Sequence, residues 1–532
     1  MTVSADTGTP DVSDPATRTS DMRRLARGSG VNLAGSLVAA ALNLVLPVVV
    51  TRGLAAADAG IFFQTTALFT ILLNVGTIGA DTGVLRSLPR ALALGRATDL
   101  GPILKVALWP AVALSTALAI VLALLAGPIA AAATGGDTDA ARAFSTTLLI
   151  LSPVLPVAVC YLVTMAATRG LGSLKPLVLI EKLGRNALQV AAVAVVVITT
   201  GSLSFVIAAW VLPYLAASLV VAAWTWATVR RLQAVAPEPD SSTPPSAGLA
   251  REFWGFSAPR ALSRVFSVAL QRFDIIIVGA LRGPQDAALY AVATRFPILG
   301  LMFVQAIQQV MAPRISQMHA LGDSRRTLEL YRTTTAWLTL VSWPIYLISV
   351  CFAGLLLDVF GAGYDEATPV VVILCLTMLV ATACGPVDSV LLMGGRSVLS
   401  LLNTGLALTV TVVLDLVLIP RYGITGAAVG WSLGILVNNL LPLWQVKRTM
   451  GMHPFGVPTV CAMGLTLVAY GCVPAVVRLL AGDGVLPLVV AGALATGVFV
   501  LGGFWARRPL ELDRLVAAIR RRHGDEVPAS GS

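Results

Sequence analysis

The chain has 532 residues, of which 57% are hydrophobic and only 12% charged, and its mean hydropathy is +0.84. This charge content is about half that of a soluble domain, so a water-soluble fold could not bury so much apolar surface. The net charge of +10 follows the membrane orientation described below and suits anionic lipid headgroups, so we expect no nucleic acid partner.

Residues 1–28 are predicted to form a disordered cytoplasmic tail, because the first 22 residues are rich in Thr, Ser, Asp and Pro. They lack the apolar core of a cleavable signal peptide. Apolar runs of roughly 20 residues, long enough to cross the hydrocarbon core as helix, then recur along the chain. They predict an all-α, polytopic membrane protein with about fourteen transmembrane helices, near residues 29–50, 59–80, 103–127, 145–168, 179–199, 203–228, 256–280, 286–312, 334–357, 367–393, 399–419, 423–446, 457–478 and 486–506.

The distribution of basic residues orients these helices, since Lys and Arg concentrate in cytoplasmic loops. With the amino terminus inside, all but eight of the 37 Lys and Arg fall on the cytoplasmic side, and both termini are cytoplasmic. Five of the eight face outward, and three lie deep within helices: Arg264, Arg272 and Arg295. We expect a multi-pass protein of the cytoplasmic membrane.

A Pro- and Ser-rich cytoplasmic linker at 229–255 divides the chain into an N-lobe at 29–228 and a C-lobe at 256–446. The segments DAGIFFQTTALF, from Asp58, and DAALYAVATRFP, from Asp286, align without a gap at the start of each lobe's second helix. This favours a repeat of six helices in the same orientation, although chance similarity between apolar helices is an alternative. Two further helices at 447–506 and a basic cytoplasmic tail at 507–532 complete the predicted organisation.

Polar stripes on the first two helices of each lobe predict a hydrated central cavity, because a charge at the bilayer centre costs roughly 3 kcal/mol. In the C-lobe, the polar stripes lie on the seventh and eighth helices and include arginines. In the N-lobe, the stripes consist mostly of uncharged polar residues. Packing by hydrogen bonds between helices is the alternative for any single Ser, Thr or Asn. The candidate substrate-binding residues are Arg264, Arg272, Arg295, Gln271, Gln305, Gln309, Asn43 and Asn74.

Carboxylates within or near the membrane are candidates for coupling transport to a proton or sodium ion: Asp274, Asp388, Asp415 and Asp81. Asp274 has an alternative role, a structural ion pair with Arg272 or Arg295. Asp388 has another, as a solvated residue near the inner surface. The six cysteines and three histidines show no metal-ligand spacing, so we expect no metal site and no cofactor.

The sequence resembles the polysaccharide transporter branch of the multidrug, oligosaccharidyl-lipid and polysaccharide exporter superfamily. The resemblance is carried by LQRFDIIIVGAL, ALYAVATRFP, VMAPRIS and LIPRYGITGAAVGWSLG, and by the opening hairpin VVVTRGLAAADAGIFF. It implies two six-helix lobes around a central cavity lined by helices 1, 2, 7 and 8, plus two carboxyl-terminal helices. The chain lacks the Arg-Asp start of helix 1 associated with lipid II flippases, which disfavours that substrate.

The resemblance implies a flippase, not an enzyme, that moves a polyprenyl-(pyro)phosphate-linked oligosaccharide or polysaccharide repeat unit across the membrane by alternating access. Its partners would be the lipid-linked saccharide, membrane lipids and a glycan polymerase or glycosyltransferase. One alternative is a multidrug antiporter of the same fold, whose cavity should be acidic and aromatic. Lipid II flipping and a membrane glycan polymerase or ligase are further alternatives, and the short outer loops disfavour the last.

Overall fold

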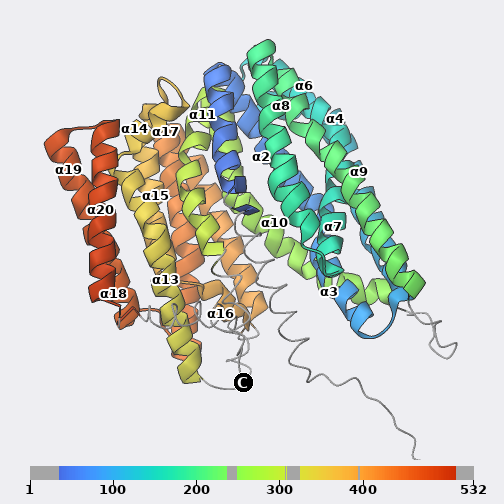
Figure 1. The fold of residues 1–532 in the computed structure, drawn as a ribbon. Helices are drawn as coiled ribbons and strands as arrows, with labels where there is room; N and C mark the ends of the chain where they lie inside the picture. Colours follow the sequence, from blue (N-terminus) through green and yellow to red (C-terminus); the bar gives the residue numbers. More distant parts are fainter. Residues whose placement is uncertain are drawn as a thin grey trace, which may run out of the picture.

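The computed structural model describes residues 35–36, 38–235, 248–305, 307, 324–393, 396–507 and 509–510. Residues 1–28, Gln309 and most of the linker and basic tail lie outside this part of the chain. Every regular element in the described part is a helix (Figure 1). In chain order these are Val38–Gly53, α2 (Ala56–Thr77), α3 (Ala80–Ala93), η1 (Ala97–Asp99), α4 (Leu100–Leu124), α5 (Ala126–Ala133), α6 (Thr138–Leu151), η2 (Ser152–Val154), α7 (Leu155–Gly170), η3 (Leu177–Arg185), α8 (Asn186–Thr199), α9 (Leu203–Val235), α10 (Leu249–Arg282), α11 (Pro284–Ala293), α13 (Ser324–Cys351), α14 (Ala353–Leu357), η4 (Asp358–Phe360), η5 (Tyr364–Ala367), α15 (Thr368–Ala383), α16 (Val387–Met393), α17 (Ser397–Met450), α18 (Val457–Thr466), η6 (Leu467–Cys472), α19 (Val473–Ala481) and α20 (Val485–Trp505).

Eleven helices in the described part of the chain are long and apolar enough to cross a membrane, which confirms an all-α, multi-pass membrane protein. The charged α10 lies outside this set although it has 34 residues. The 54-residue α17 is counted once, yet its backbone leaves the helical conformation at Gly423, the residue at which the second of two predicted helices, 423–446, begins. The count of fourteen stays a prediction.

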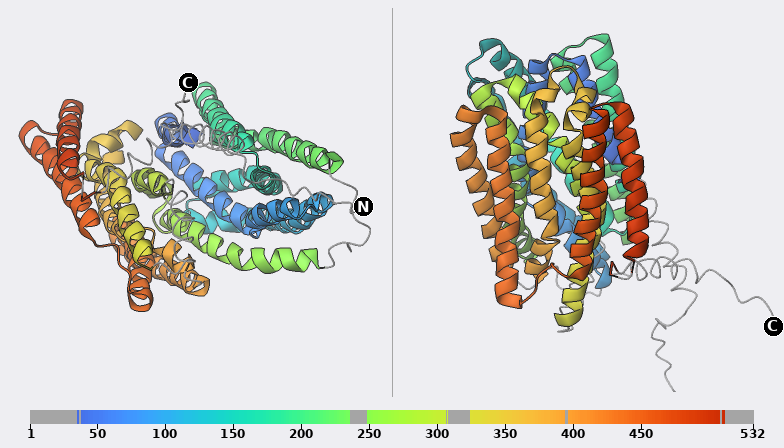
Figure 2. Two further views of the ribbon diagram at one scale, coloured as in Figure 1. Left: turned by 60° about the horizontal axis from the view of Figure 1, so that its bottom comes forward. Right: turned by 90° about the vertical axis from the view of Figure 1, so that its left-hand side faces the viewer.

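The helices group as the two predicted lobes. Within the N-lobe, α7 packs on α3, α4 and α9, and within the C-lobe α10, α13 and α15 pack with α17 or with each other. Figures 1 and 2 show α18, α19 and α20 at one edge of the molecule, where α18 packs against α13. The domain boundaries within the linker and after residue 446 stay predictions.

The lobes meet where α2 and α3 of the N-lobe pack against α10 of the C-lobe. The chain runs along α10 in the direction opposite to that of α2 and α3. At the end of the interface that the charge distribution predicts to be extracellular, Gly60 lies against Pro284, and at the opposite end Gly83 lies against Phe253. The predicted second helix, 59–80, continues further than expected, because α3 extends it to Ala93 after a break. Two left-handed residues make that break, Ile78 with φ 46° and Gly79 with φ 72°. Of these, Ile78 carries the steric penalty of a β-branched side chain at positive φ.

A close backbone approach between the lobes depends on a missing side chain. A Cβ atom at Gly60 would lie 1.7 Å from the carbonyl oxygen of Pro284. Since this neighbour is backbone and cannot rotate away, we expect Gly60→Ala to lower the free energy of unfolding by about 2 kcal/mol. Thermal unfolding of the purified protein in detergent measures this. Gly127→Ala is the control, because a Cβ there meets nothing within 4 Å, and equal midpoints for the two variants would contradict the expectation.

Beyond Gly423, α17 folds back on itself as a hairpin packed through small residues. Gly426, Gly430 and Gly434 recur every four residues, and a Cβ at each would come within 2.4 Å of Leu418, Asp415 and Thr411, respectively. Small residues at this spacing let two membrane helices approach closely and gain packing contacts. The arms are joined further along, where Asn403 and Gln445 exchange two side-chain hydrogen bonds of 2.8 and 2.9 Å.

Candidate functional site

Several of the predicted charges lie together where α10 and α11 meet the N-lobe. These are Arg272, Asp274 and Arg295, with Tyr290 beside them. Asp274 is buried on α10, where one carboxylate oxygen accepts a 2.6 Å hydrogen bond from the Tyr290 hydroxyl of α11. The other accepts a 2.9 Å bond from the Ile275 backbone N–H. The two arginines lie close enough to interact electrostatically with each other, and Arg272 also interacts with Asp274.

Neither arginine forms a direct ion pair with a carboxylate in the part of the chain that the structure describes. The ion pairs within 4 Å that join described residues do not include Arg272, Arg295 or Asp274. Asp274 acts on Arg272 without a contact within 4 Å, and the structural ion pair stays an alternative interpretation of this residue. Arg295 instead lies over the ring of Phe63 in α2, 5.4 Å from its centroid, and its Nε is buried without a hydrogen-bond partner.

Asp415 lies on the first arm of the α17 hairpin, within electrostatic reach of both Asp274 and Tyr290. Its side chain is fully buried, and neither carboxylate oxygen has a hydrogen-bond partner among the described residues. Buried polar atoms are nearly always paired, so two orphaned oxygens mark a place where a proton or cation would be stabilised. Asp274 and Asp415 thus form one acidic pair.

The other two predicted coupling residues lie apart from this pair. Asp388 of α16 accepts a 2.6 Å hydrogen bond from Ser400, at the end of the molecule that the charge distribution predicts to be cytoplasmic. This end is called the inner end below. Asp81, at the start of α3, interacts electrostatically with Arg169 of α7. The four carboxylates therefore do not make a single site.

Among the other predicted substrate-binding residues, Arg264 and Asn74 meet across the lobe interface, with 3.4 Å between the arginine Nε and the amide oxygen. Arg264 lies eight residues before Arg272 on α10, and so about 12 Å closer to the inner end. The remaining residues, Asn43, Gln271 and Gln305, are exposed and make no hydrogen bond to a described residue.

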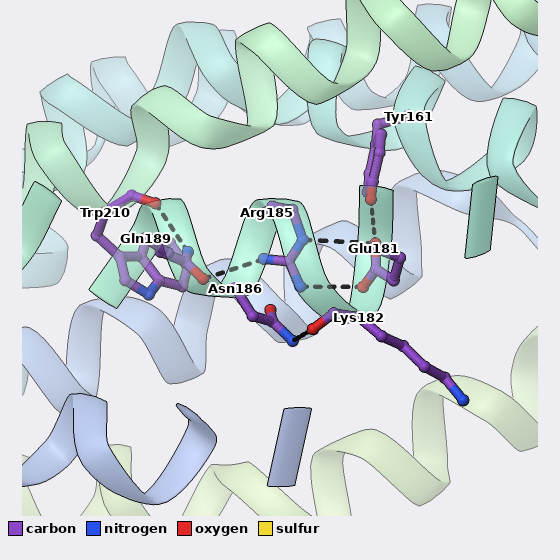
Figure 3. A network of polar contacts seen from close by, with 7 residues as sticks. All are labelled: Tyr161, Glu181, Lys182, Arg185, Asn186, Gln189 and Trp210. Carbon is purple, nitrogen blue, oxygen red and sulfur yellow. Dashed lines mark hydrogen bonds and ion pairs between the residues drawn. The ribbon is translucent and has the colours of Figure 1, made fainter. Parts of the chain in front are cut away.

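A buried polar network in the N-lobe was not predicted (Figure 3). Arg185 and Glu181 form a 2.9 Å ion pair on the π-helix η3, and Tyr161 donates a hydrogen bond to the same carboxylate. Arg185 also donates to the Gln189 side chain, which donates in turn to the Trp210 carbonyl. Tyr161, Gln189 and Trp210 place this pair between three helices, α7, α8 and α9.

Tyr161 and Trp210 of this network belong to a cluster of aromatic rings. Six rings from α2, α7 and α9 are joined by edge-to-face or tilted contacts with centroids 5.5–6.3 Å apart: Phe62, Phe63, Phe69, Tyr161, Trp210 and Tyr214. The Arg185 guanidinium lies 4.6 Å from the Tyr214 centroid. This cluster was not predicted, because ring contacts between helices distant in the sequence leave no local pattern.

At the inner end, the junction of the lobes is nearly closed. A pocket of about 70 Å³ lies between α3, α4 and α10, bordered by Ser87, Arg90 and Glu252. Arg90 and Glu252 form an ion pair across the junction. Since pockets for drug-sized ligands measure about 300–1,000 Å³, a ligand of that size would fit here only if the lobes separated.

Comparisons with known proteins agree with this architecture. The chain matches the family model described as polysaccharide biosynthesis protein over residues 25–319, and the model described as MatE over residues 259–417. A probable low-salt glycan biosynthesis flippase of Haloferax volcanii is 25% identical over 205 residues, covering 37% of this chain and 42% of that protein. A putative O-antigen transporter of Shigella flexneri is 22% identical over 201 residues, covering 37% and 47%. The matched stretch thus spans less than half the length of either relative.

Solved structures of the same fold include a lipid II flippase in an inward closed conformation, with a TM-score of 0.70, 12% identity and coverage of 91% of this chain and 99% of that one. An inward-facing multidrug resistance transporter of the MATE family has a TM-score of 0.66 at 15% identity, covering 80% and 98%. These likenesses establish the fold, and the first family model covers more than half of the chain. The chain belongs to the polysaccharide biosynthesis protein family, within the polysaccharide transporter branch of the multidrug, oligosaccharidyl-lipid and polysaccharide exporter superfamily.

Proposed function

We propose that the protein is a flippase for a polyprenyl-(pyro)phosphate-linked oligosaccharide or polysaccharide repeat unit in the cytoplasmic membrane, with both termini in the cytoplasm. The observation that carries this proposal is the pair Arg272 and Arg295. Their like charges interact repulsively, and neither arginine forms a direct ion pair with a described carboxylate. Two half-buried cations without a direct counter-charge among the described residues favour an anionic ligand.

Phosphate is the anion that this pair suits best. The planar guanidinium fork can donate two parallel hydrogen bonds to phosphate oxygens, and it keeps its charge at every physiological pH. The orphaned Nε of Arg295 is a donor already positioned at the lobe interface. In the proposed complex the pyrophosphate lies between Arg272 and Arg295, and the polyprenyl chain stays in the bilayer.

Transport then requires the lobes to open on alternate sides. The lobes touch at the inner end through Arg90 and Glu252. At the outer end Arg52 donates hydrogen bonds of 3.1 and 2.7 Å to the backbone carbonyls of Asp358 and Val359. Breaking one set while keeping the other is the simplest form of alternating access. Outward movement of an anion gains about 2.3 kcal/mol per charge from a 100 mV inside-negative potential.

The pair Asp274 and Asp415 supplies a second part of the proposal, coupling to a proton or sodium ion. Both carboxyls are buried, and the two carboxylate oxygens of Asp415 lack hydrogen-bond partners among the described residues. Binding a cation there would neutralise an acidic pair that lies beside the arginines. The ion could therefore alter how strongly Arg272 is held by Asp274, and hence its affinity for phosphate.

The same acidic pair, together with the MatE match over residues 259–417, is what favours a multidrug antiporter as second candidate. The two candidates differ in the charge of the cargo. We expect proteoliposomes containing the full chain to flip a fluorescent polyprenyl-pyrophosphate-linked saccharide, scored by its accessibility to a membrane-impermeant quencher or lectin. Export of ethidium without any saccharide flipping would overturn the proposal in favour of the antiporter.

A further inference from the structure

Two cysteines lie close together where the last helices of the chain join the C-lobe. Cys351 is the last residue of α13, and Cys472 is the last residue of the π-helix η6. The Cys351 Sγ lies 3.8 Å from the backbone carbonyl oxygen of Gly471, the residue directly before Cys472. The two thiols are also close enough to interact electrostatically. All six cysteines of the chain are free thiols, so the pair is present in its reduced form.

The missing side chain of Gly471 lets α13 pack directly on the backbone of η6. A Cβ atom there would lie 3.7 Å from the Cδ2 atom of Leu347. Leu347 precedes Cys351 by about one helical turn, so both side chains lie on the face of α13 that contacts η6. Small residues at such contacts let membrane helices approach closely. The position of the Cys351 thiol beside η6 is therefore set by the packing of two helices.

Arg478 places this contact near the end of the molecule that the charge distribution predicts to be extracellular. Its guanidinium donates a 2.5 Å hydrogen bond to the Cys351 carbonyl oxygen and is ion-paired with Asp483, between α19 and α20. Cys472 precedes Arg478 by six residues, about 9 Å along a helix, and so lies that much deeper in the membrane. Disulfides form and persist in extracellular environments, where the reducing systems of the cytosol are absent.

The two thiols differ in accessibility. Cys472 is exposed, whereas Cys351 is half-buried. Redox-active cysteines are often accessible and lie next to a second thiol that completes a disulfide. The cysteines in the core of the C-lobe, Cys375 and Cys384, are buried. Cys472 is therefore the thiol of this lobe that an oxidant dissolved in the membrane reaches first.

We propose that Cys351 and Cys472 are an oxidisable thiol pair, whose disulfide ties η6 and its neighbours α18, α19 and α20 to α13. The Cys351 thiol would turn from the Gly471 carbonyl toward the next residue, since a disulfide joins Cβ atoms about 3.8 Å apart. The oxidant is molecular oxygen, which dissolves in lipid. Two S–H bonds break and one S–S bond forms, while oxygen takes up two electrons and two protons and becomes hydrogen peroxide.

The disulfide would fix one edge of the molecule to the C-lobe. Figures 1 and 2 show α18, α19 and α20 at this edge. α18, η6 and α19 each pack against α13, and α20 packs against these three elements. A cross-link that closes a long loop of chain lowers the entropy of the unfolded state, so it would strengthen this attachment. The pair lies apart from Arg272 and Arg295, and the proposal is independent of the proposed function.

The test counts free thiols in the full chain. The purified protein in nanodiscs is oxidised by air with copper phenanthroline as catalyst, denatured, alkylated with N-ethylmaleimide and weighed intact. We expect wild type to lose two of its six reactive thiols and to regain both with dithiothreitol. Peptide mapping of the oxidised protein should give one cross-linked species that contains Cys351 and Cys472. Retention of all six thiols would overturn the proposal, and this readout requires no variant.

Single variants assign the cross-link to the pair. Cys351→Ser and Cys472→Ser should each form no internal cross-link, because each lacks one partner. Cys461→Ser is the matched control, since Cys461 is half-buried on α18 and packs in a cluster with Ala336 of α13 but lies outside the pair. It should still lose two thiols on oxidation. Equal thiol loss in Cys472→Ser and Cys461→Ser would overturn the assignment.

Two further readouts test the geometry and its effect. A disulfide-linked dimer of wild type on a non-reducing gel, in place of the internal cross-link, would overturn the pair, because it would show that Cys472 reacts with a second copy. Oxidised wild type should also unfold at a higher temperature than reduced wild type, whereas oxidation should leave the midpoint of Cys472→Ser unchanged. An equal midpoint for both forms of wild type would overturn the strengthened attachment.

Discussion

Replacing Arg272 and Arg295 together by Gln is expected to reduce flipping of the lipid-linked saccharide by about a hundredfold. Each arginine can donate charge-assisted hydrogen bonds worth about 1.5–3 kcal/mol, so losing one bond from each removes about 3 kcal/mol. That loss corresponds to the stated factor if the phosphate is held most tightly during passage. Initial flipping rates in proteoliposomes give the measurement.

Stability separates a functional role from a structural one. The two guanidiniums repel each other and lack a direct carboxylate partner among the described residues. The double variant should therefore unfold at the same temperature as wild type or a higher one when no substrate is present. Arg282→Gln serves as the control, since Arg282 pairs with Asp286 at the outer end and should flip at the wild-type rate. Wild-type flipping in the double variant would remove both arginines from the mechanism.

Glu181→Gln is expected to cost about 3 kcal/mol of folding free energy, the lower end of the range for breaking a buried ion pair. The Arg185 side chain is only 11% exposed, whereas that of Glu181 keeps 26%. Without the carboxylate, Arg185 would be left charged among the rings and helices of the N-lobe, with Gln189 as its remaining partner. The midpoint of thermal or chemical unfolding in detergent reports the loss.

The double variant Glu181→Gln with Arg185→Gln supplies the second half of this test, because removing both charges should restore much of the lost stability. Asp139→Asn breaks the pair between Asp139 and Arg142, whose side chains are 90% and 79% exposed. It should change stability by less than about 1 kcal/mol. If the single variant at Glu181 were no less stable than this control, the network would not contribute to the stability of the fold.

Much of the fold follows from composition and hydropathy. The apolar runs located the membrane helices to within a few residues in most cases, since a span of hydrocarbon demands a run of apolar side chains. The wrongly predicted helix ends share one cause. Several helices continue through polar residues beyond the apolar run that spans the membrane. Thus α13 begins at Ser324, ten residues before the predicted start at 334, and α3 occupies a stretch expected to be a loop.

The candidate site was only partly accessible from the sequence. Arg264, Arg272 and Arg295 could be singled out because charge is rare in apolar runs. The hydrogen bond from Tyr290 to Asp274 could not, since it joins α10 to α11 and Tyr is unremarkable near a helix start. In η3, the π-helical turns also shift the faces of the helix, so that a periodicity of 3.6 residues misplaces Glu181.

The hairpin of α17 ties a packing motif to a titratable group. A Cβ at Gly430 would come within 2.3 Å of the Asp415 carboxylate oxygen. Any side chain at position 430 would therefore displace that carboxyl before it disturbed the rest of the hairpin. Natural variation at the two positions should be linked: homologues that replace Gly430 by Ala or Ser should also have shortened, lost or relocated the acid. The proposed ion-coupling role of Asp415 thus predicts a sequence signature at a glycine that bears no charge.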